Sequence, residues 1–181
     1  MNTRALTAED WLDLALQELK AHGYSALKAQ PLAKKLNVTR GSFYHHFESL
    51  EAFHLAVIDH WSNTTSGRIA EDAQKIGDAS EALDDLLQKT LRSGEALERA
   101  IRSWSTVAPD VAKAVEVVDQ ERIGIAETLL REAGVAQSTA SGRAKLLYWA
   151  AIGRLMLPFP ENNALSRAEI SALAALMTRR Y

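Results

Sequence analysis

The run from Leu32 to Phe47 limits what this chain can fold into more than any other segment. It reads LAKKLNVTRGSFYHHF, with apolar residues spaced to face inward on either side of a short break. Asn37 stands at the break, and asparagine tolerates the left-handed backbone that a tight turn needs. Thr39 can cap a helix that follows the turn. The pattern therefore predicts two short helices joined by a turn, a helix-turn-helix.

The second of these helices carries a dense set of hydrogen-bonding side chains. We expect Phe43 and Phe47, four residues apart, to face the core and leave the polar side chains outside. The polar residues are Arg40, Ser42, Tyr44, His45 and His46. So many hydrogen-bonding groups on a short helix are what contact with a DNA groove requires.

The distribution of charge supports this interpretation better than its sum does. The net charge of −2 argues against a nucleic-acid binder, yet residues 19–47 contain no acid. The five cations of this window are Lys20, Lys28, Lys34, Lys35 and Arg40. A local positive patch suits a protein that touches phosphates with one surface. An ordinary solvated face is the alternative.

The remainder of the chain also has helical patterns. Capping boxes are predicted at Thr7–Asp10 and Ser166–Glu169, and Ser49 is expected to cap a long helix over about residues 50–76. We find no strand pattern and no internal repeat. The fold class is therefore predicted to be all-α, with a three-helix N-terminal domain followed by further helices.

Several functional classes lack support in the sequence. The 181 residues include no cysteine, which excludes disulfides, thiol catalysis and cysteine-zinc sites. No phosphate loop, nucleophile elbow or acid/base dyad is present, and His45 and His46 point about 100° apart on a helix. We therefore expect no enzyme activity, no metal site and no cofactor.

The apolar segments do not predict a membrane protein. The longest apolar run, residues 146–159, is interrupted by Gly153, Arg154 and Pro158, and is shorter than the roughly 20 residues that span a bilayer. The N-terminal residues do not form a signal peptide. We expect a soluble, cytoplasmic protein.

The chain resembles the TetR family of transcriptional regulators, above all over about residues 12–57. The segments that carry the resemblance are Gly23-Tyr24, Leu32-Ala33, residues 38–47 and Glu51-Ala52. It implies a DNA-binding domain over residues 1–50 and a ligand-binding and dimerisation domain over residues 51–181. The expected function is that of a ligand-responsive repressor, which binds a palindromic operator as a homodimer.

The resemblance also assigns roles to single residues. Bases or nearby phosphates are expected at Arg40, Gly41, Ser42 and His45, and phosphates at Tyr44 and His46, while Gln30 can reach DNA. Arginine can bind guanine O6 and N7 through two parallel bonds. Two positions depart from the family pattern. Lys28 replaces a usual Thr or Ser, and Leu50, followed by Glu51, replaces a usual phosphate-binding Lys that Lys28 could partly substitute.

The C-terminal helices provide the other predicted surfaces. The segment near residues 139–157 is apolar almost all round, so every side of it should be buried. The resemblance implies a dimer interface formed by the last two helices, with Leu146, Ala150, Gly153, Ile170, Leu173 and Met177. Burial within one chain is the alternative. A small-molecule effector pocket could be lined by Trp104, Tyr148, Trp149 and Met156, which could equally be simple core residues.

A second hypothesis for the whole chain remains open at this point. Lys28, Leu50 and the near-zero net charge also suit a helical dimer that binds a ligand or protein and has weakened or lost DNA binding.

Overall fold

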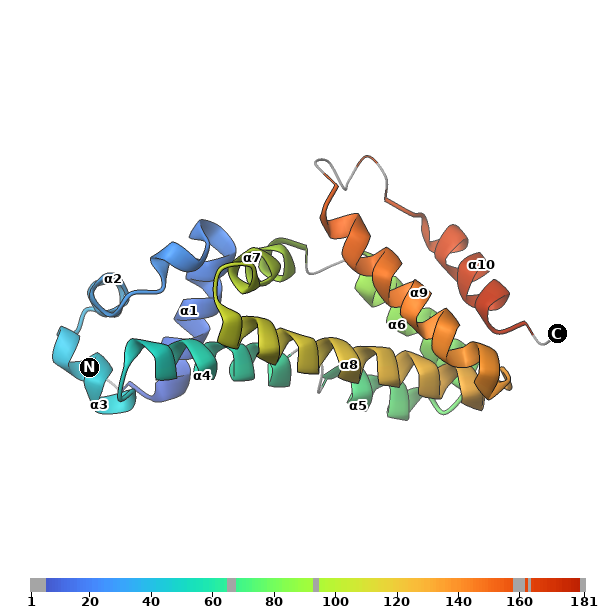
Figure 1. Ribbon diagram of the computed structural model, residues 1–181, viewed down its shortest axis with the longest axis horizontal. Helices are drawn as coiled ribbons and strands as arrows, with labels where there is room; N and C mark the ends of the chain where they lie inside the picture. The colour runs from blue at the N-terminus through green and yellow to red at the C-terminus, as the bar shows by residue number, and fades with distance from the viewer. Residues whose placement is uncertain (1–5, 65–67, 93–94, 158–161, 163, 180–181) are drawn as a thin grey trace, which may run out of the picture. The chain divides into compact units, whose positions relative to one another are not determined.

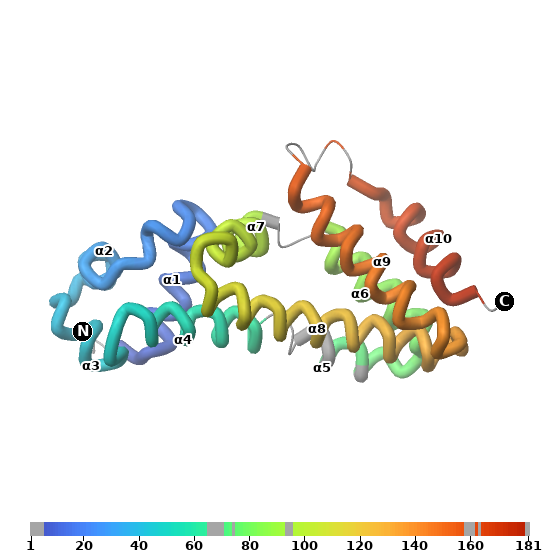
Figure 2. Tube along the Cα trace, viewed as in Figure 1, coloured from blue at the N-terminus to red at the C-terminus, as the bar shows by residue number. Residues whose placement is uncertain are grey.

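The computed structural model describes residues 6–64, 68–92, 95–157, 162 and 164–179. Within these ranges the chain forms helices and turns and no strand, which confirms the all-α prediction (Figures 1 and 2). It divides into two compact units. The first consists of residues up to Asn63 together with Ala96–Glu116, and the second consists of Thr64–Glu95 together with the residues from Val117 onward.

The first unit contains the N-terminal helices and one later helix. Its elements are α1 (Ala8–His22), the short 3₁₀ helix η1 (Tyr24–Ala26), α2 (Ala29–Lys35), α3 (Arg40–His46), α4 (Leu50–Ser62), α7 (Glu95–Ser105) and the start of α8 (Pro109–Glu132). The predicted capping box begins α1, where the Asp10 carboxylate accepts the Thr7 amide at 2.7 Å. Gly23 ends α1 with a φ of 74°.

Large aromatic and aliphatic side chains form the core of this unit. The fully buried members include Trp11, Leu19, Leu32, Phe43, Phe53, Trp61 and Ile101. α7 joins them through Trp104, whose ring centroid lies 5.0 Å from that of His54 on α4. His60, also on α4, contacts Asp13 of α1 at 2.7 Å. These contacts position α1, α4 and α7 together.

The second unit contains α5 (Arg68–Ile76), α6 (Ala79–Arg92), the rest of α8, α9 (Gln137–Leu155) and α10 (Arg167–Met177). Its core includes Leu83, Leu130, Leu147 and Ile170. The predicted capping box of α10 is present, with the Glu169 carboxylate accepting the Ser166 amide at 2.8 Å.

The helix predicted over about residues 50–76 corresponds to α4, which ends at Ser62, and α5, which begins at Arg68. Asn63 and Thr64 continue from α4 in π-helical conformation. Residues 65–67 lie outside the described part, so the predicted continuity between α4 and α5 stays a prediction. No helix among the described residues is long and apolar enough to cross a membrane.

Candidate nucleic-acid interface

The turn between α2 and α3 is fixed by its own backbone. The Val38 amide donates to the Ala33 carbonyl at 3.0 Å, and the Asn37 amide donates to the Lys34 carbonyl at 3.2 Å. This pair of bonds is the Schellman arrangement that closes a helix around a left-handed residue. Asn37 supplies that residue with a φ of 57°, as the sequence predicted.

α3 begins where the sequence predicts, but without the predicted side-chain cap. Thr39 is the N-cap, but its hydroxyl makes no capping hydrogen bond. The Thr39 carbonyl instead accepts the Ser42 amide at 3.0 Å and closes the first turn. The prediction that the Thr39 side chain caps this helix is therefore wrong, although the helix begins where expected.

Phe43 holds α3 against the rest of the first unit. Its side chain is fully buried, and its ring packs edge-on against Trp11 of α1 at 5.5 Å and Phe53 of α4 at 5.0 Å between centroids. Phe47 is also buried. Both aromatic predictions are confirmed, and the polar side of α3 consequently faces outward.

Arg40 and Tyr44 form a pair on the outward side of α3. The Arg40 guanidinium donates from Nη2 to the Tyr44 hydroxyl at 3.0 Å and lies 5.4 Å from the centre of its ring. Both side chains are exposed. This contact limits the freedom of a long side chain before any partner arrives, so Arg40 and Tyr44 are expected to act together.

The two histidines have different surroundings. His45 is exposed, whereas His46 is half-buried with its ring 6.4 Å from that of Trp11 and 6.3 Å from that of Phe47. No group of three or more His, Cys, Asp or Glu side chains among the described residues could hold a metal ion. His45 is thus free to reach outward, and His46 has an apolar support on one side.

The first turn of α3 carries two small residues, Gly41 and Ser42. Gly41 is exposed, and a Cβ added there would meet only the Thr39 hydroxyl oxygen, at an ordinary 3.6 Å. Packing within the chain therefore does not require glycine, which costs roughly 1 kcal/mol of helix propensity. The half-buried Ser42 follows it. A surface that must approach this backbone closely would explain Gly41.

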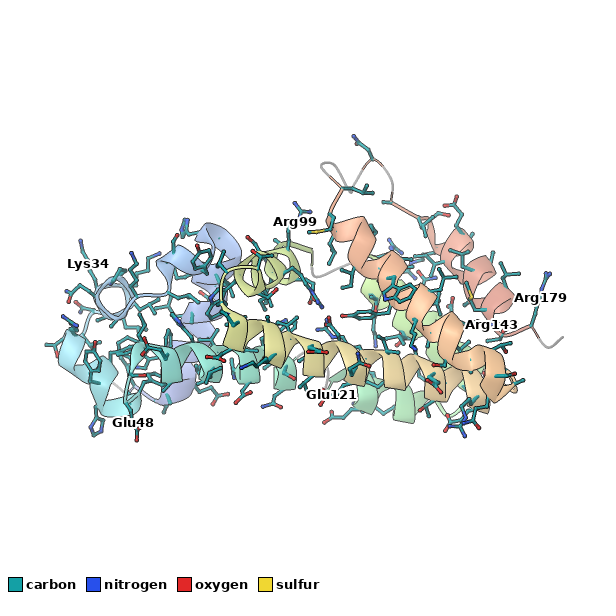
Figure 3. All side chains as sticks on the ribbon, in the orientation of Figure 1. Lys34, Glu48, Arg99, Glu121, Arg143 and Arg179 are labelled. Carbon is teal, nitrogen blue, oxygen red and sulfur yellow. The ribbon has the colours of Figure 1, made fainter. Side chains whose placement is uncertain are left out.

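Within the described part of the chain, α2 carries lysines with and without an ion pair. Lys28 is the N-cap of α2 and, like Gln30, is exposed. Lys34 is exposed and makes no ion pair among the described residues (Figure 3). Lys35 instead pairs with Glu18 of α1 at 2.5 Å, a contact between residues 17 positions apart that no local sequence pattern predicts.

Acids border the same surface where α4 begins. Glu48 is exposed in the loop before α4 (Figure 3), and Glu51 is exposed in its first turn. A hydrogen bond from its own backbone, followed by one from the Ser49 side chain, holds the pKa of Glu51 below its ordinary value of 4.5. Glu51 is therefore ionised at neutral pH, at the place where the resemblance expects a phosphate-binding cation.

The predicted effector residues are divided between the two units. Trp104 is buried in the first unit, and the other three belong to the second. Tyr148 is half-buried and donates to Asp119 at 2.5 Å. Trp149 and Met156 are 63% and 59% exposed. An effector pocket lined by these residues stays a prediction.

The predicted interface residues separate into two groups. Leu146, Ala150 and Gly153 lie exposed on α9. On α10, Leu173 is half-buried, whereas Ile170 is fully buried in the core of the second unit and Met177 packs against that core. Leu176, which the sequence reasoning missed, is 43% exposed; its spacing three residues after Leu173 could have indicated it.

Comparison with known proteins supports both the motif and the whole fold. Residues 12–57 match the family model described as bacterial regulatory proteins, tetR family. This segment runs from α1 into α4 and so contains the complete helix-turn-helix. No curated protein matched the chain.

Solved structures are similar to this chain along nearly its full length. E. coli NemR in its reduced form is 20% identical, with a TM-score of 0.78, over 94% of this chain and 96% of that one. A TetR transcriptional regulator from Legionella pneumophila is 19% identical, with a TM-score of 0.76, over 99% and 100%. Salmonella enterica GusR is 20% identical, with a TM-score of 0.71, over 94% and 93%. At these identities the likeness establishes the fold.

Proposed function

We propose that this chain, which belongs through its residues 12–57 to the tetR family of bacterial regulatory proteins, represses transcription by binding an operator with α3. The observation that carries the proposal is the division of α3 into two sides. Phe43 anchors one side in an aromatic core, and the other presents Arg40, Tyr44 and His45 to solvent. Such a regulator would act in the cytoplasm.

Each outward residue of α3 has a distinct role in this proposal. Arg40 reads base edges, where a bidentate contact with guanine contributes ~1–3 kcal/mol of discrimination. Tyr44, already hydrogen-bonded to Arg40, positions that guanidinium and donates its own hydroxyl to a phosphate. Gly41 and the small Ser42 let the helix backbone lie close to the duplex.

The remaining contacts orient the motif on the DNA backbone. Lys28, Gln30 and Lys34 extend from α2, and His46 extends from the end of α3. Phosphate contacts fix register and orientation and carry no sequence information directly. Because Lys35 is paired with Glu18, Lys34 is the stronger candidate for the salt-dependent contact.

Binding experiments with two variants separate these roles. Arg40→Ala should lower affinity for the operator and relax preference at one base pair, by ~1–3 kcal/mol. Lys34→Ala should weaken binding to all sequences alike and reduce the salt slope by about 0.9. Equal loss of selectivity in both variants would contradict the assignment, and unchanged operator affinity in Arg40→Ala would reject base reading by α3.

The chain is further proposed to act as a homodimer through α9. Leu146, Trp149, Ala150, Gly153 and Met156 recur at three- and four-residue spacing and are all exposed in the single chain. Exposed apolar faces of this size on a soluble chain indicate an interaction surface. Gly153 has open space where a Cβ would stand, so a second helix can approach closely.

Dimerisation also explains how one short reading helix becomes specific. A single helix contacts few base pairs, and a pair of them reads two half-sites about one helical turn apart. Trp149 and Met156 fit this interface better than a pocket in one chain, because they lie on the same exposed face as Leu146. Ile170 is left out of it, since its side chain is buried in its own chain.

The proposed effector acts by linkage between sites. A ligand that binds better to one helix arrangement shifts the population toward it, and a change in DNA affinity follows only from that difference. Titrating the protein–operator complex with candidate small molecules tests this directly. An effector must change the dissociation constant of the protein–operator complex, and binding to the protein alone is not sufficient.

A second function is favoured by one feature of the site. Leu50 and the ionised Glu51 replace a cation at the start of α4, which suits a helical dimer with weakened DNA binding. A gel shift against DNA flanking the chain's own gene distinguishes the two functions. Salt-dependent binding without any preferred sequence would favour the second.

A further inference from the structure

A hollow of about 390 Å³ lies between the end of α1, η1 and α7, entirely within the first unit. It is lined by Leu19, Lys20, Gly23, Tyr24, Ala96, Arg99, Ala100 and Ser103. The fully buried Leu19 and the small Ala96 and Ala100 provide its apolar wall. Figure 1 shows α7 beside the C-terminal end of α1, on the side of the first unit away from α3.

The polar lining of this hollow is entirely cationic or hydroxyl-bearing. Lys20 and Arg99 bring two positive charges, Tyr24 and Ser103 bring two hydroxyls, and no acid is among the described residues that line it. The Nε of Arg99 is buried and has no hydrogen-bond partner among the described residues. Within the same described part, Lys20 has no ion pair.

Two neighbouring cations of the same unit do have acid partners. Arg102, one turn after Arg99 on α7, donates twice to Glu98, at 3.0 and 2.8 Å. Lys35 is paired with Glu18. Arg102 and Lys35 are thus neutralised by a nearby acid, whereas Lys20 and Arg99 both line a hollow that has no acid among its described lining residues.

Two like charges and a buried unsatisfied donor in the lining of one hollow favour an anion there. Charge-assisted bonds to carboxylate or phosphate are the strong ones, and arginine presents a planar fork suited to both. The volume falls in the range of small-molecule sites, which exceeds what an inorganic ion needs. The apolar wall provides a surface for a carbon skeleton.

We propose that this hollow binds a small organic anion, with its carboxylate or phosphate head held by Lys20 and Arg99 and its apolar body against Leu19, Ala96 and Ala100. Tyr24 and Ser103 donate additional hydrogen bonds to the head. The bound anion ties α7 to α1, the helix that packs against the reading motif. The site therefore does not depend on DNA binding, and the proposed function can fail without affecting it.

Calorimetric titration of the full chain tests the proposal. The probes are benzoate and phenyl phosphate, with benzamide as the uncharged analogue and inorganic phosphate as the head alone. We expect one aromatic anion to bind per chain, with amide resonance shifts confined to Gly23, Tyr24, Ala96, Ala100 and their neighbours. The tighter of the two aromatic anions identifies the head group.

Variants locate the binding. Lys20→Gln and Arg99→Gln should each weaken the tighter probe by at least about tenfold. Lys113→Gln is the matched control, because Lys113 is a highly exposed lysine of the same unit whose pairing is confined to Asp110. Thermal unfolding checks that each variant folds. If Arg99→Gln does not fold, Arg99→Lys keeps the charge without the fork and should bind several-fold more weakly than wild type.

Three results would overturn the proposal. These are equal binding of benzamide, no saturable binding of either aromatic anion at millimolar concentration, and wild-type affinity in both Lys20 and Arg99 variants. Variants that instead lower DNA affinity, with no saturable probe binding, would identify the hollow as a DNA backbone contact and reject the anion site.

Discussion

The helices α3 and α9 each bury one side in their own unit, but they present different chemistry on the other. α3 buries Phe43 and turns Arg40 and Tyr44 outward, whereas α9 buries Leu147 and turns Leu146 and Trp149 outward. A polar exposed face leaves donors for an aqueous, charged partner. An apolar exposed face gains by excluding water. The same helix geometry thus serves the proposed recognition of DNA in one unit and the proposed self-association in the other.

The strongest test of this comparison removes the anchor of the polar helix. Phe43→Ala should lower the free energy of unfolding by about 3–5 kcal/mol, because Phe43 is fully buried among aromatic rings. Urea unfolding at fixed protein concentration measures it. Tyr44→Ala, at a 46% exposed neighbour, should change stability little. Similar losses in both would mean that α3 has no distinct inner and outer side.

The matching test places a charge on the apolar face. Trp149→Asp should weaken the proposed dimer by at least about 2 kcal/mol, because a central buried aromatic contributes strongly to an interface. Sedimentation equilibrium measures the dissociation constant. Val117→Asp is the control, since Val117 of α8 is 59% exposed and apolar but lies on another helix. A dimer that tolerates Trp149→Asp would remove α9 from the interface.

Gly41→Ala separates binding from stability on the polar face. The added Cβ meets only an ordinary contact with Thr39, so stability should rise by up to about 1 kcal/mol. DNA affinity should fall about tenfold if the duplex approaches this backbone. Unfolding and operator binding are measured on the same preparation. Undiminished DNA affinity would show that Gly41 faces no close partner.

Substitutions at the start of α4, beside the polar face of α3, should give a smaller gain in DNA affinity. Leu50→Lys should strengthen DNA binding a few-fold and steepen the salt slope by about 0.9, as expected for one more phosphate contact. Glu51→Gln, which removes the ionised carboxylate, should act in the same direction without steepening the slope as much. No change in either slope would place the start of α4 away from the DNA backbone.

The smallest expected effect concerns the capping box, which begins α1 in the first unit and α10 in the second. Hydrogen bonds from the Ser166 side chain, then from its backbone, hold the pKa of Glu169 below its ordinary value of 4.5. When folding lowers the pKa of a carboxyl, the ionised group stabilises the fold at pH values above the pKa of the unfolded chain. That stabilisation is lost as pH falls through the pKa of the folded chain. Glu169→Gln should therefore reduce the loss of stability that follows as pH falls below the ordinary value of 4.5. An unaltered pH profile would contradict the assignment.

Sequence reasoning succeeded where a local rule decides the structure. The capping boxes of α1 and α10, the turn at Asn37 and the inward side of α3 all follow from residues within four positions of one another. The Thr39 side-chain cap is the local exception. Sequence reasoning made no prediction for contacts between distant residues. The pairing of Lys35 with Glu18 and the burial of Ile170 depend on which helices pack together.

The sequence by itself determined an all-helical chain with a helix, α3, whose polar residues lie opposite Phe43, because helical periodicity and capping act over one or two turns. Only the tertiary structure brought α7 into the first unit, where Trp104 meets His54 and Arg99 lines the same hollow as Lys20. Only packing likewise decided which apolar residues of α9 stay exposed. Such pairings join segments tens of residues apart, and no local pattern encodes them.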